Sequence, residues 1–263
     1  MTEKTESQDR YNVPGLERGL KVLLEFNRQN MALTAPELAK RLDLPRTTVF
    51  RLLSTLEAMG FVTRQGNEYR LGMAVLRLGF EFLASLELTE LGQPILNRLS
   101  QDIGYSCNLV VRDERSIVYV AKVTPPSILS SSVNVGARLP AHATVLGRIL
   151  LEDLSLAELK ALYPEDELPG YSSSTPRNAE QLHSMLQQDI QQGYALSEGF
   201  YESSISTIAA PVRNREGKVI AALGATIPSG HIDDELLQPL VDKVRGSASE
   251  LSRLLGYSRS APF

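Results

Sequence analysis

Residues 34–71, TAPELAKRLDLPRTTVFRLLSTLEAMGFVTRQGNEYRL, predict two short helices followed by a β-hairpin. Thr34 and Glu37 stand at the spacing of a capping box, so we expect the first helix to begin at Ala35. The sequence Asp-Leu-Pro at 43–45 then interrupts the apolar pattern as a tight turn. Two helices separated by so short a turn are typical of a helix-turn-helix unit.

The second helix and the segment after it complete the pattern. Pro45 suits a first helical turn, where an amide would lack a partner anyway, and Gly60 ends the helix. Short strands over 61–64 and 69–71 flank a polar turn and predict a hairpin wing. Two arginines of this wing are available for backbone phosphate: Arg64 and Arg70.

Apolar and polar side chains separate onto two sides of the second helix. The side facing the core carries Val49, Leu52, Leu53 and Leu56. The other side, or its border, carries Arg46, Thr47, Thr48, Phe50, Arg51 and Ser54. A helix of this kind fits the major groove of DNA, where arginine can bind guanine and hydroxyl groups can reach bases or phosphates. The alternative is a small helical bundle with a solvated charged face, which the agreement of cap, turn and wing disfavours.

Length, charge and cysteine content limit the class of protein. A chain of 263 residues, 43% hydrophobic, suggests two domains with buried cores. The net charge is −4, yet residues 13–71 hold nine Lys/Arg against six Asp/Glu, a local excess that suits phosphate binding. No segment resembles a membrane span or a secretion signal, and Cys107 is the single cysteine. We therefore expect a cytoplasmic protein.

Residues 71–88, LGMAVLRLGFEFLASLEL, predict a helix with two apolar stripes. One stripe holds Leu71, Val75, Leu78 and Phe82, and the other holds Met73, Leu76, Phe80 and Leu83. One stripe can pack against its own domain, and we expect the other to meet the same helix of a second subunit. A wholly internal linker helix is the alternative.

The remainder alternates helical and strand patterns and predicts a mostly antiparallel sheet. We expect helices over 89–103, 154–162, 178–192 and 233–255. We expect strands over 105–111, 116–123, 205–213 and 218–227, with a further strand near 128–133.

Residues 137–148 lead through Pro140 and small side chains into another helix. Its first free amides are expected near Ala143, Thr144 and Val145, where a helix start attracts anions. Small side chains there allow a ligand carboxylate to approach the backbone. An ordinary helix start with a satisfied cap is the alternative.

Four stretches in order resemble the IclR family of bacterial transcriptional regulators: VPGLERGLKVLLEF at 13–26, LPRTTVFRLLSTLEAMGFV at 44–62, GARLPAHATVLGRILL at 136–151 and GYALSEGFYESSISTIAAPVRNREGKVIAALGATIP at 193–228. The resemblance implies an α+β protein, in which a linker helix joins an N-terminal winged helix-turn-helix to a C-terminal GAF-like α/β effector-binding domain. It also implies a homodimer or a dimer of dimers. The corresponding segments are a disordered tail at 1–12, the DNA-binding domain at 13–71, the linker at 72–87 and the effector domain at 88–263.

The same resemblance implies a pocket for a small organic acid. Its apolar lining would be Ile128, Leu139, Val145, Leu146 and Ile205, and its polar groups Ser197, Thr207 and Thr226. Gly224 stands where some relatives have serine, Phe200 where many have an acidic residue, and Ser204 where glycine is common. The ring of Phe200 could stack on an aromatic effector, although packing on a core is the ordinary role of such a ring.

No catalytic or cofactor pattern is present in the sequence. His142, His183 and His231 are far apart and follow no metal-ligand spacing, so we expect no metal and no cofactor. The preferred function is a ligand-responsive DNA-binding regulator, a repressor rather than an activator, that binds a palindromic operator of a catabolic operon. The alternatives are a small-molecule enzyme with an appended DNA-binding domain, and a DNA-binding protein that responds to no effector.

Overall fold

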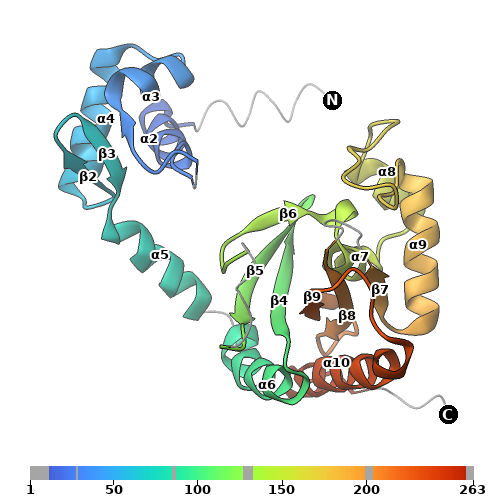
Figure 1. The fold of residues 1–263 in the computed structure, drawn as a ribbon. Helices are drawn as coiled ribbons and strands as arrows, with labels where there is room; N and C mark the ends of the chain where they lie inside the picture. Colours follow the sequence, from blue (N-terminus) through green and yellow to red (C-terminus); the bar gives the residue numbers. More distant parts are fainter. Residues whose placement is uncertain (1–11, 28, 85–86, 127–132, 199–203, 259–263) are drawn as a thin grey trace. The chain divides into compact units, whose positions relative to one another are not determined.

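The computed structural model describes residues 12–27, 29–84, 87–126, 133–198 and 204–258, with the backbone alone for 79–84. The chain divides into two compact units, residues 1–85 and residues 86–263 (Figure 1).

The N-terminal unit combines helices with a small antiparallel sheet of order β1-β3-β2. Its elements are α2 (Pro14–Leu24), β1 (Leu33–Thr34), α3 (Ala35–Arg41), α4 (Arg46–Ala58), β2 (Val62–Gln65), β3 (Glu68–Leu71) and α5 (Met73–Ala84). The core of this unit holds buried side chains from α2, α3, α4 and the hairpin, among them Val22, Leu38, Leu53 and Tyr69. The predicted helix-turn-helix and wing are confirmed.

The ends of α3 and α4 follow from their capping residues. The Thr34 hydroxyl accepts from the Glu37 amide, and the Glu37 carboxylate accepts from the Thr34 amide, so α3 begins at Ala35 as predicted. Pro45 is the N-cap of α4 and not part of its first turn, because its ψ of 138° is not helical. Gly60, at a φ of 75°, ends α4 in the left-handed region that favours glycine.

The C-terminal unit is built on six antiparallel strands in the order β6-β5-β4-β9-β8-β7. Its strands are β4 (Ser106–Asp113), β5 (Ser116–Val123), β6 (Arg138–Pro140), β7 (Ala195–Glu198), β8 (Ser206–Arg213) and β9 (Val219–Ile227). Its helices are α6 (Glu87–Ile103), the short 3-10 turn η1 (Ala141–Ala143), α7 (Val145–Leu151), α8 (Leu156–Leu162), α9 (Ala179–Gln192) and α10 (Asp234–Leu254).

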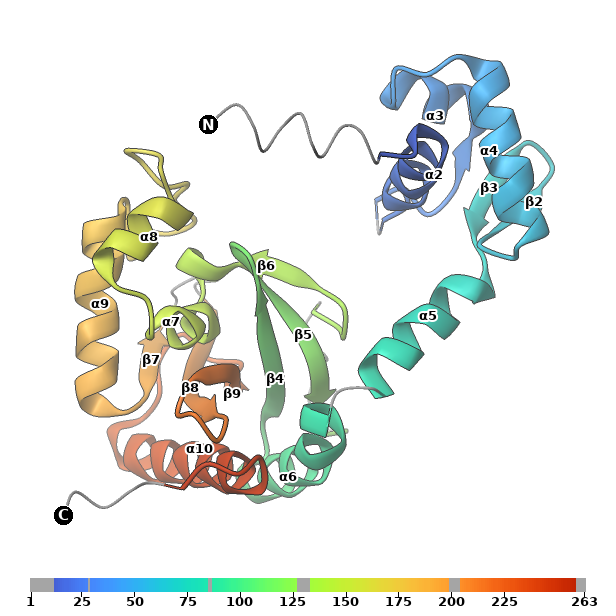
Figure 2. The same cartoon turned by 180° about the vertical axis from the view of Figure 1, so that it is seen from behind.

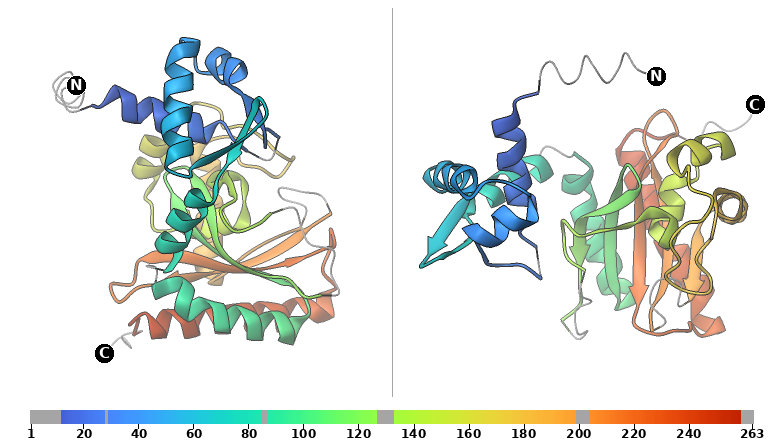
Figure 3. Two further views of the ribbon diagram at one scale, coloured as in Figure 1. Left: turned by 90° about the vertical axis from the view of Figure 1, so that its left-hand side faces the viewer. Right: turned by 90° about the horizontal axis from the view of Figure 1, so that it is seen from above.

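Helices cover both faces of this sheet. Helices α6 and α10 lie side by side against one face, as the views of Figures 1 and 2 agree and the left panel of Figure 3 shows. Helix α7 packs on the other face over β8 and β9, and α9 and α8 lie outside it. The larger core, which includes Val110, Ile149 and Leu186, fills the space between the sheet, α7 and α9.

Two edge strands were not predicted, and one prediction lies outside the described residues. The strands β6 and β7 are only three and four residues long, too short for a clear alternating pattern. The strand expected near 128–133 falls on residues outside the description, except for Val133, which is in no strand. The expected long helices and both hairpins are present within a few residues of their predicted bounds.

Candidate nucleic-acid interface and effector site

Helix α4 turns its polar side chains away from the core of its unit. Val49 and Leu53 are fully buried, whereas the predicted contact residues are exposed, with Thr48 half-buried: Arg46, Thr47, Phe50, Arg51 and Ser54. Phe50 exposes 48% of its surface among these polar neighbours. An exposed aromatic side chain in such a place can contact the methyl group of thymine, while arginine supplies paired donors for guanine.

An open groove of about 480 Å³ separates α4 from the wing. Its lining comes from both elements: Phe50, Arg51, Ser54, Thr55, Glu57, Arg64 and Tyr69. The fold therefore brings Arg51 of α4 beside Arg64 of β2, as a DNA-binding surface requires. Glu57 adds one carboxylate at the groove, a residue that was not among the predicted contacts.

The two wing arginines have different surroundings. The Nε of Arg64 donates to the Gly66 carbonyl at 2.8 Å, and its guanidinium carbon lies 5.7 Å from the centre of the Tyr69 ring. These contacts hold Arg64 at the groove. Arg70 forms an exposed ion pair with Glu68 at 3.7 Å and does not line the groove, so binding a phosphate would require it to leave that carboxylate.

In the C-terminal unit, the start of α7 is closely packed. Ala141 and Ala143 are fully buried in η1, and a Cβ on Gly147 would lie 2.0 Å from the Ala141 oxygen. Thr144 is the N-cap and accepts from the Gly147 amide at 3.1 Å. The alternative of a satisfied cap is therefore confirmed for this amide. Helix α7 is also only seven residues long, so the summed dipole that would attract an anion to its start is small.

The three predicted polar effector residues lie in one row across the sheet. Ser197 is opposite Thr207, and Thr207 is opposite Thr226. Ser106 of β4 continues this row opposite Thr226, and its hydroxyl donates to Thr124 at 3.5 Å. We call these five side chains the hydroxyl row. The members on β4 and just after β5 were missed, because the pairing of distant strands is not a local signal.

The row belongs to the face of the sheet that α7 covers. Gly224, two residues before Thr226 on β9, would bring a Cβ within 2.8 Å of Leu146 Cδ2. Leu146 thus occupies the space that a side chain at position 224 would need. Val145 and Leu146 are buried in the core, and Leu139 packs against it. Ile205 is half-buried just before β8, and the two remaining predicted residues, Ile128 and Phe200, lie outside the described residues.

A buried ion pair ties α7 to α9. The Nε and Nη2 atoms of Arg148 donate to the Asp189 carboxylate at 2.8 and 3.0 Å, with side chains only 5% and 7% exposed. Nη2 also donates to the Leu196 carbonyl of β7 at 3.2 Å. Burial raises the pKa of Asp189 to about 6 despite the nearby guanidinium. The pair borders a polar cavity of about 270 Å³ that also reaches Ser197.

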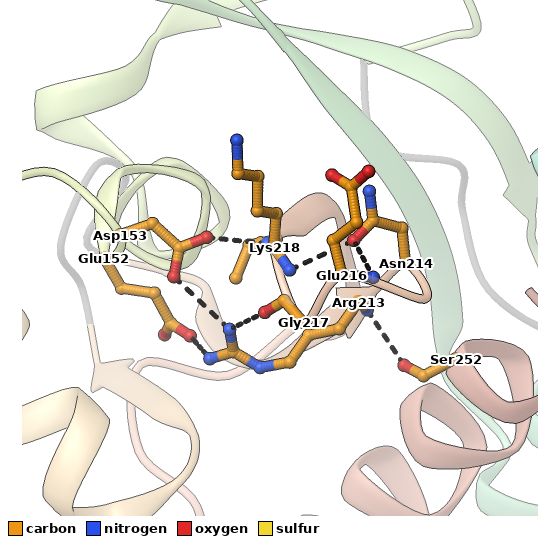
Figure 4. Close-up of polar contacts among 9 residues, drawn as sticks. Glu152, Asp153, Arg213, Asn214, Glu216, Gly217, Lys218 and Ser252 are labelled. Atoms are coloured by element: carbon orange, nitrogen blue, oxygen red, sulfur yellow. Dashed lines mark hydrogen bonds and ion pairs between the residues drawn. The ribbon is translucent and has the colours of Figure 1, made fainter. Parts of the chain in front are cut away.

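The C-terminal end of α7 is fixed to the β8–β9 hairpin (Figure 4). Arg213 pairs with Glu152 and also donates to Asp153 and to the Gly217 carbonyl, at 3.3 and 2.8 Å. The Arg213 amide donates to Ser252 of α10 at 2.9 Å. Burial raises the pKa of Glu152 to about 7, because the carboxylate loses more hydration than Arg213 replaces. Charged groups therefore hold α7 at its middle, through Arg148, and at its C-terminal end, through Glu152 and Asp153.

The histidines and the cysteine have ordinary structural surroundings. His142 is buried against the Pro169 carbonyl at 3.0 Å, and His231 pairs with Glu198 at 2.9 Å on the surface. Burial raises the pKa of Cys107 to about 12, so its thiol is inert at neutral pH. Within the described ranges, no group of three metal-ligating side chains forms, and no helix is long and apolar enough for a bilayer.

Two family models match this chain. The model of the IclR helix-turn-helix domain matches residues 15–66, and that of the bacterial transcriptional regulator IclR C-terminal domain matches residues 80–253. The HTH-type transcriptional regulator XynR of Escherichia coli K12 is 32% identical over 93% of this chain and 98% of its own length. The acetate operon repressor of Salmonella typhimurium LT2 is 28% identical over 94% and 92%.

The solved structures include an IclR homologue from Microbacterium hydrocarbonoxydans in complex with 4-hydroxybenzoate. It superposes with a TM-score of 0.80 at 27% identity and covers 92% of this chain and 98% of its own.

Proposed function

Because the chain belongs to the IclR family of bacterial transcriptional regulators, we propose that it represses a catabolic operon in response to a small organic acid. Its helix-turn-helix binds DNA and its C-terminal domain binds a small-molecule effector. The family consists of regulators and not of enzymes. Relatives that are named as repressors, among them the acetate operon repressor, support repression.

The observation that carries the proposal is the outer face of α4 together with its groove. Arg46 and Arg51 are exposed on α4, and Arg64 is oriented at the wing. Base contacts from α4 would specify the operator, and phosphate contacts from the wing would position the protein on it. The operator is proposed to be palindromic, because the regulator is proposed to bind it as a homodimer or a dimer of dimers.

Apolar side chains on the described part of α5 support the proposed dimer. Met73 and Leu76 of one predicted stripe expose 76% and 48% of their surface, and Leu78 of the other stripe, which was the candidate for packing against its own domain, exposes 58%. A second copy of the same helix would remove this surface from water, which is favourable in proportion to the apolar area buried. Effector binding would then change operator affinity by favouring one arrangement of the paired helices. Sedimentation that shows only monomer at micromolar concentration would contradict this part of the proposal.

The experiment is transcription in vitro from a promoter fragment selected from genomic DNA by the purified protein. We expect the protein to reduce transcription, and one of a panel of keto, hydroxy and aromatic acids to relieve or strengthen that effect. Transcription that is unchanged by the protein, with every acid of the panel, would contradict the proposed function. An increase in transcription on addition of the protein would show that it is an activator and not a repressor.

A further inference from the structure

The face of the sheet under α7 changes from apolar to polar along its strands. Where α7 covers β8 and β9, side chains such as Ala209 and Ala222 are fully buried. In the hydroxyl row, nearer one end of the strands, Ser197, Thr207 and Thr226 are only half-buried. Ser106 is buried and donates to Thr124, whereas the hydroxyls of Ser197, Thr207 and Thr226 lie on side chains that are open enough for a ligand to reach. Such a surface is suited to a ligand that brings hydrogen-bonding groups of its own.

A lysine and an asparagine lie in the neighbouring cross-strand row, on the same face of the sheet. Lys122 of β5 lies opposite Asn108 of β4, and Asn108 lies opposite Gly224, which faces α7. The Asn108 side chain is 97% buried, and its Nδ2 donates to the Thr226 hydroxyl at 2.9 Å. Lys122 is half-buried and its Nζ donates to the Val133 carbonyl at 2.5 Å. Lys122 is the charged side chain of these two cross-strand rows, and its charge is positive.

The geometry points to a polyhydroxylated carboxylic acid, a sugar acid, as the effector, and this inference rests on the proposed function. We propose that Lys122 binds the carboxylate through a charge-assisted hydrogen bond, while Asn108 orients Thr226. The hydroxyl row then binds the hydroxyl groups of the ligand. An aromatic ring on the same row would cover the half-buried hydroxyls of Ser197 and Thr207 without offering them hydrogen-bonding groups, which costs free energy. The positive charge and the hydroxyls therefore select an acid that carries both kinds of group.

The test uses the full chain and four kinds of probe. Gluconate and threonate carry a carboxylate and hydroxyls, hexanoate carries the carboxylate alone, glucitol carries hydroxyls alone, and 4-hydroxybenzoate is aromatic. Binding is measured by the shift in melting temperature and by calorimetric titration. We expect gluconate or threonate to bind at least about tenfold more tightly than each of the other three probes, since it alone satisfies both groups.

Variants show whether the binding uses the proposed groups. Lys122→Met and the double variant Thr207→Val/Thr226→Val should each weaken the sugar acid about tenfold or more, since each removes partners but little volume. Lys243→Met is the matched control, because Lys243 also donates to a backbone carbonyl, that of Asp102 at 3.0 Å, but lies on α10. This control should leave binding unchanged. The melting temperature without ligand checks that every variant is folded.

Two results would overturn the inference. One is that neither gluconate nor threonate binds more tightly than hexanoate or 4-hydroxybenzoate. The other is that a sugar acid binds equally well to the folded Lys122→Met variant. Operator binding, measured on the same samples, separates this failure from a failure of the proposed function. If the protein binds its operator but responds only to the aromatic acid, the proposed function stands and the sugar acid is rejected as the effector.

Discussion

Replacing Arg148 by methionine should destabilise the C-terminal unit through the carboxylate it leaves behind. Arg148 and Asp189 are each less than a tenth exposed and share two hydrogen bonds of 2.8 and 3.0 Å. Breaking a buried pair from one side typically costs about 3–5 kcal/mol, because the remaining charge has lost both water and partner. We therefore expect urea unfolding at neutral pH to show a loss of about 3–5 kcal/mol in the free energy of unfolding for Arg148→Met.

The double variant Arg148→Met/Asp189→Leu provides the decisive comparison. It removes both charges and keeps an apolar filling, so its stability should return to within about 1 kcal/mol of the wild type. The control is Lys160→Met, because Lys160 pairs with Glu180 at 2.6 Å between side chains that are more than half exposed. That change should cost at most about 1 kcal/mol. Equal losses in the single and double variants would refute the role assigned to the unpaired carboxylate.

Three further outcomes are expected from single residues. The pKa of Glu152 is raised to about 7 from an ordinary 4.5, so the folded protein binds this proton more tightly than the unfolded chain does. The free energy of unfolding of the wild type should therefore fall as the pH rises between these two values. Urea unfolding of Glu152→Gln over the same pH range should lack this contribution. Gly224→Ser places a Cβ 2.8 Å from Leu146 Cδ2 and 2.9 Å from the Ile208 oxygen, so thermal unfolding should show a loss of about 1–3 kcal/mol, and an unchanged melting temperature would show that α7 moves freely. If Phe50 contacts a thymine methyl, uracil in place of that thymine should weaken binding of the wild type but not of Phe50→Ala.

Local signals in the sequence were sufficient for most of the N-terminal unit. The capping box at Thr34 and Glu37 predicted the first residue of α3, and the spacing of Val49 and Leu53 predicted which side of α4 is buried. The wing followed from turn residues around Gly66, whose φ is 63°. Each of these features depends on residues within a few positions of one another, so a single sequence contains the necessary information.

The effector region was harder to predict, because it is formed by residues that are distant in the sequence. Arg148 and Asp189 are 41 positions apart, and neither lies in a pattern that predicts pairing. Lys122 and Asn108 are neighbours only because of the register between β4 and β5, which the sequence does not reveal. The sequence therefore predicted a carboxylate bound by amides at the start of α7, and Lys122 was missed. Ser197, Thr207 and Thr226 were anticipated through the family resemblance, and the strand register places them in one row.

The most direct test of the account is the preference of wild type and Arg51→Ala for a selected promoter fragment over random duplex at physiological salt. The account predicts that the wild type prefers the promoter by about a thousandfold or more, and that Arg51→Ala loses roughly tenfold to a hundredfold of that preference. Arg64→Ala, at the wing, should weaken binding to both duplexes alike and lower the dependence on salt. A wild type without preference for any fragment, with and without candidate acids, or an Arg51→Ala variant with full preference, would contradict the claim that the outer face of α4 reads the operator.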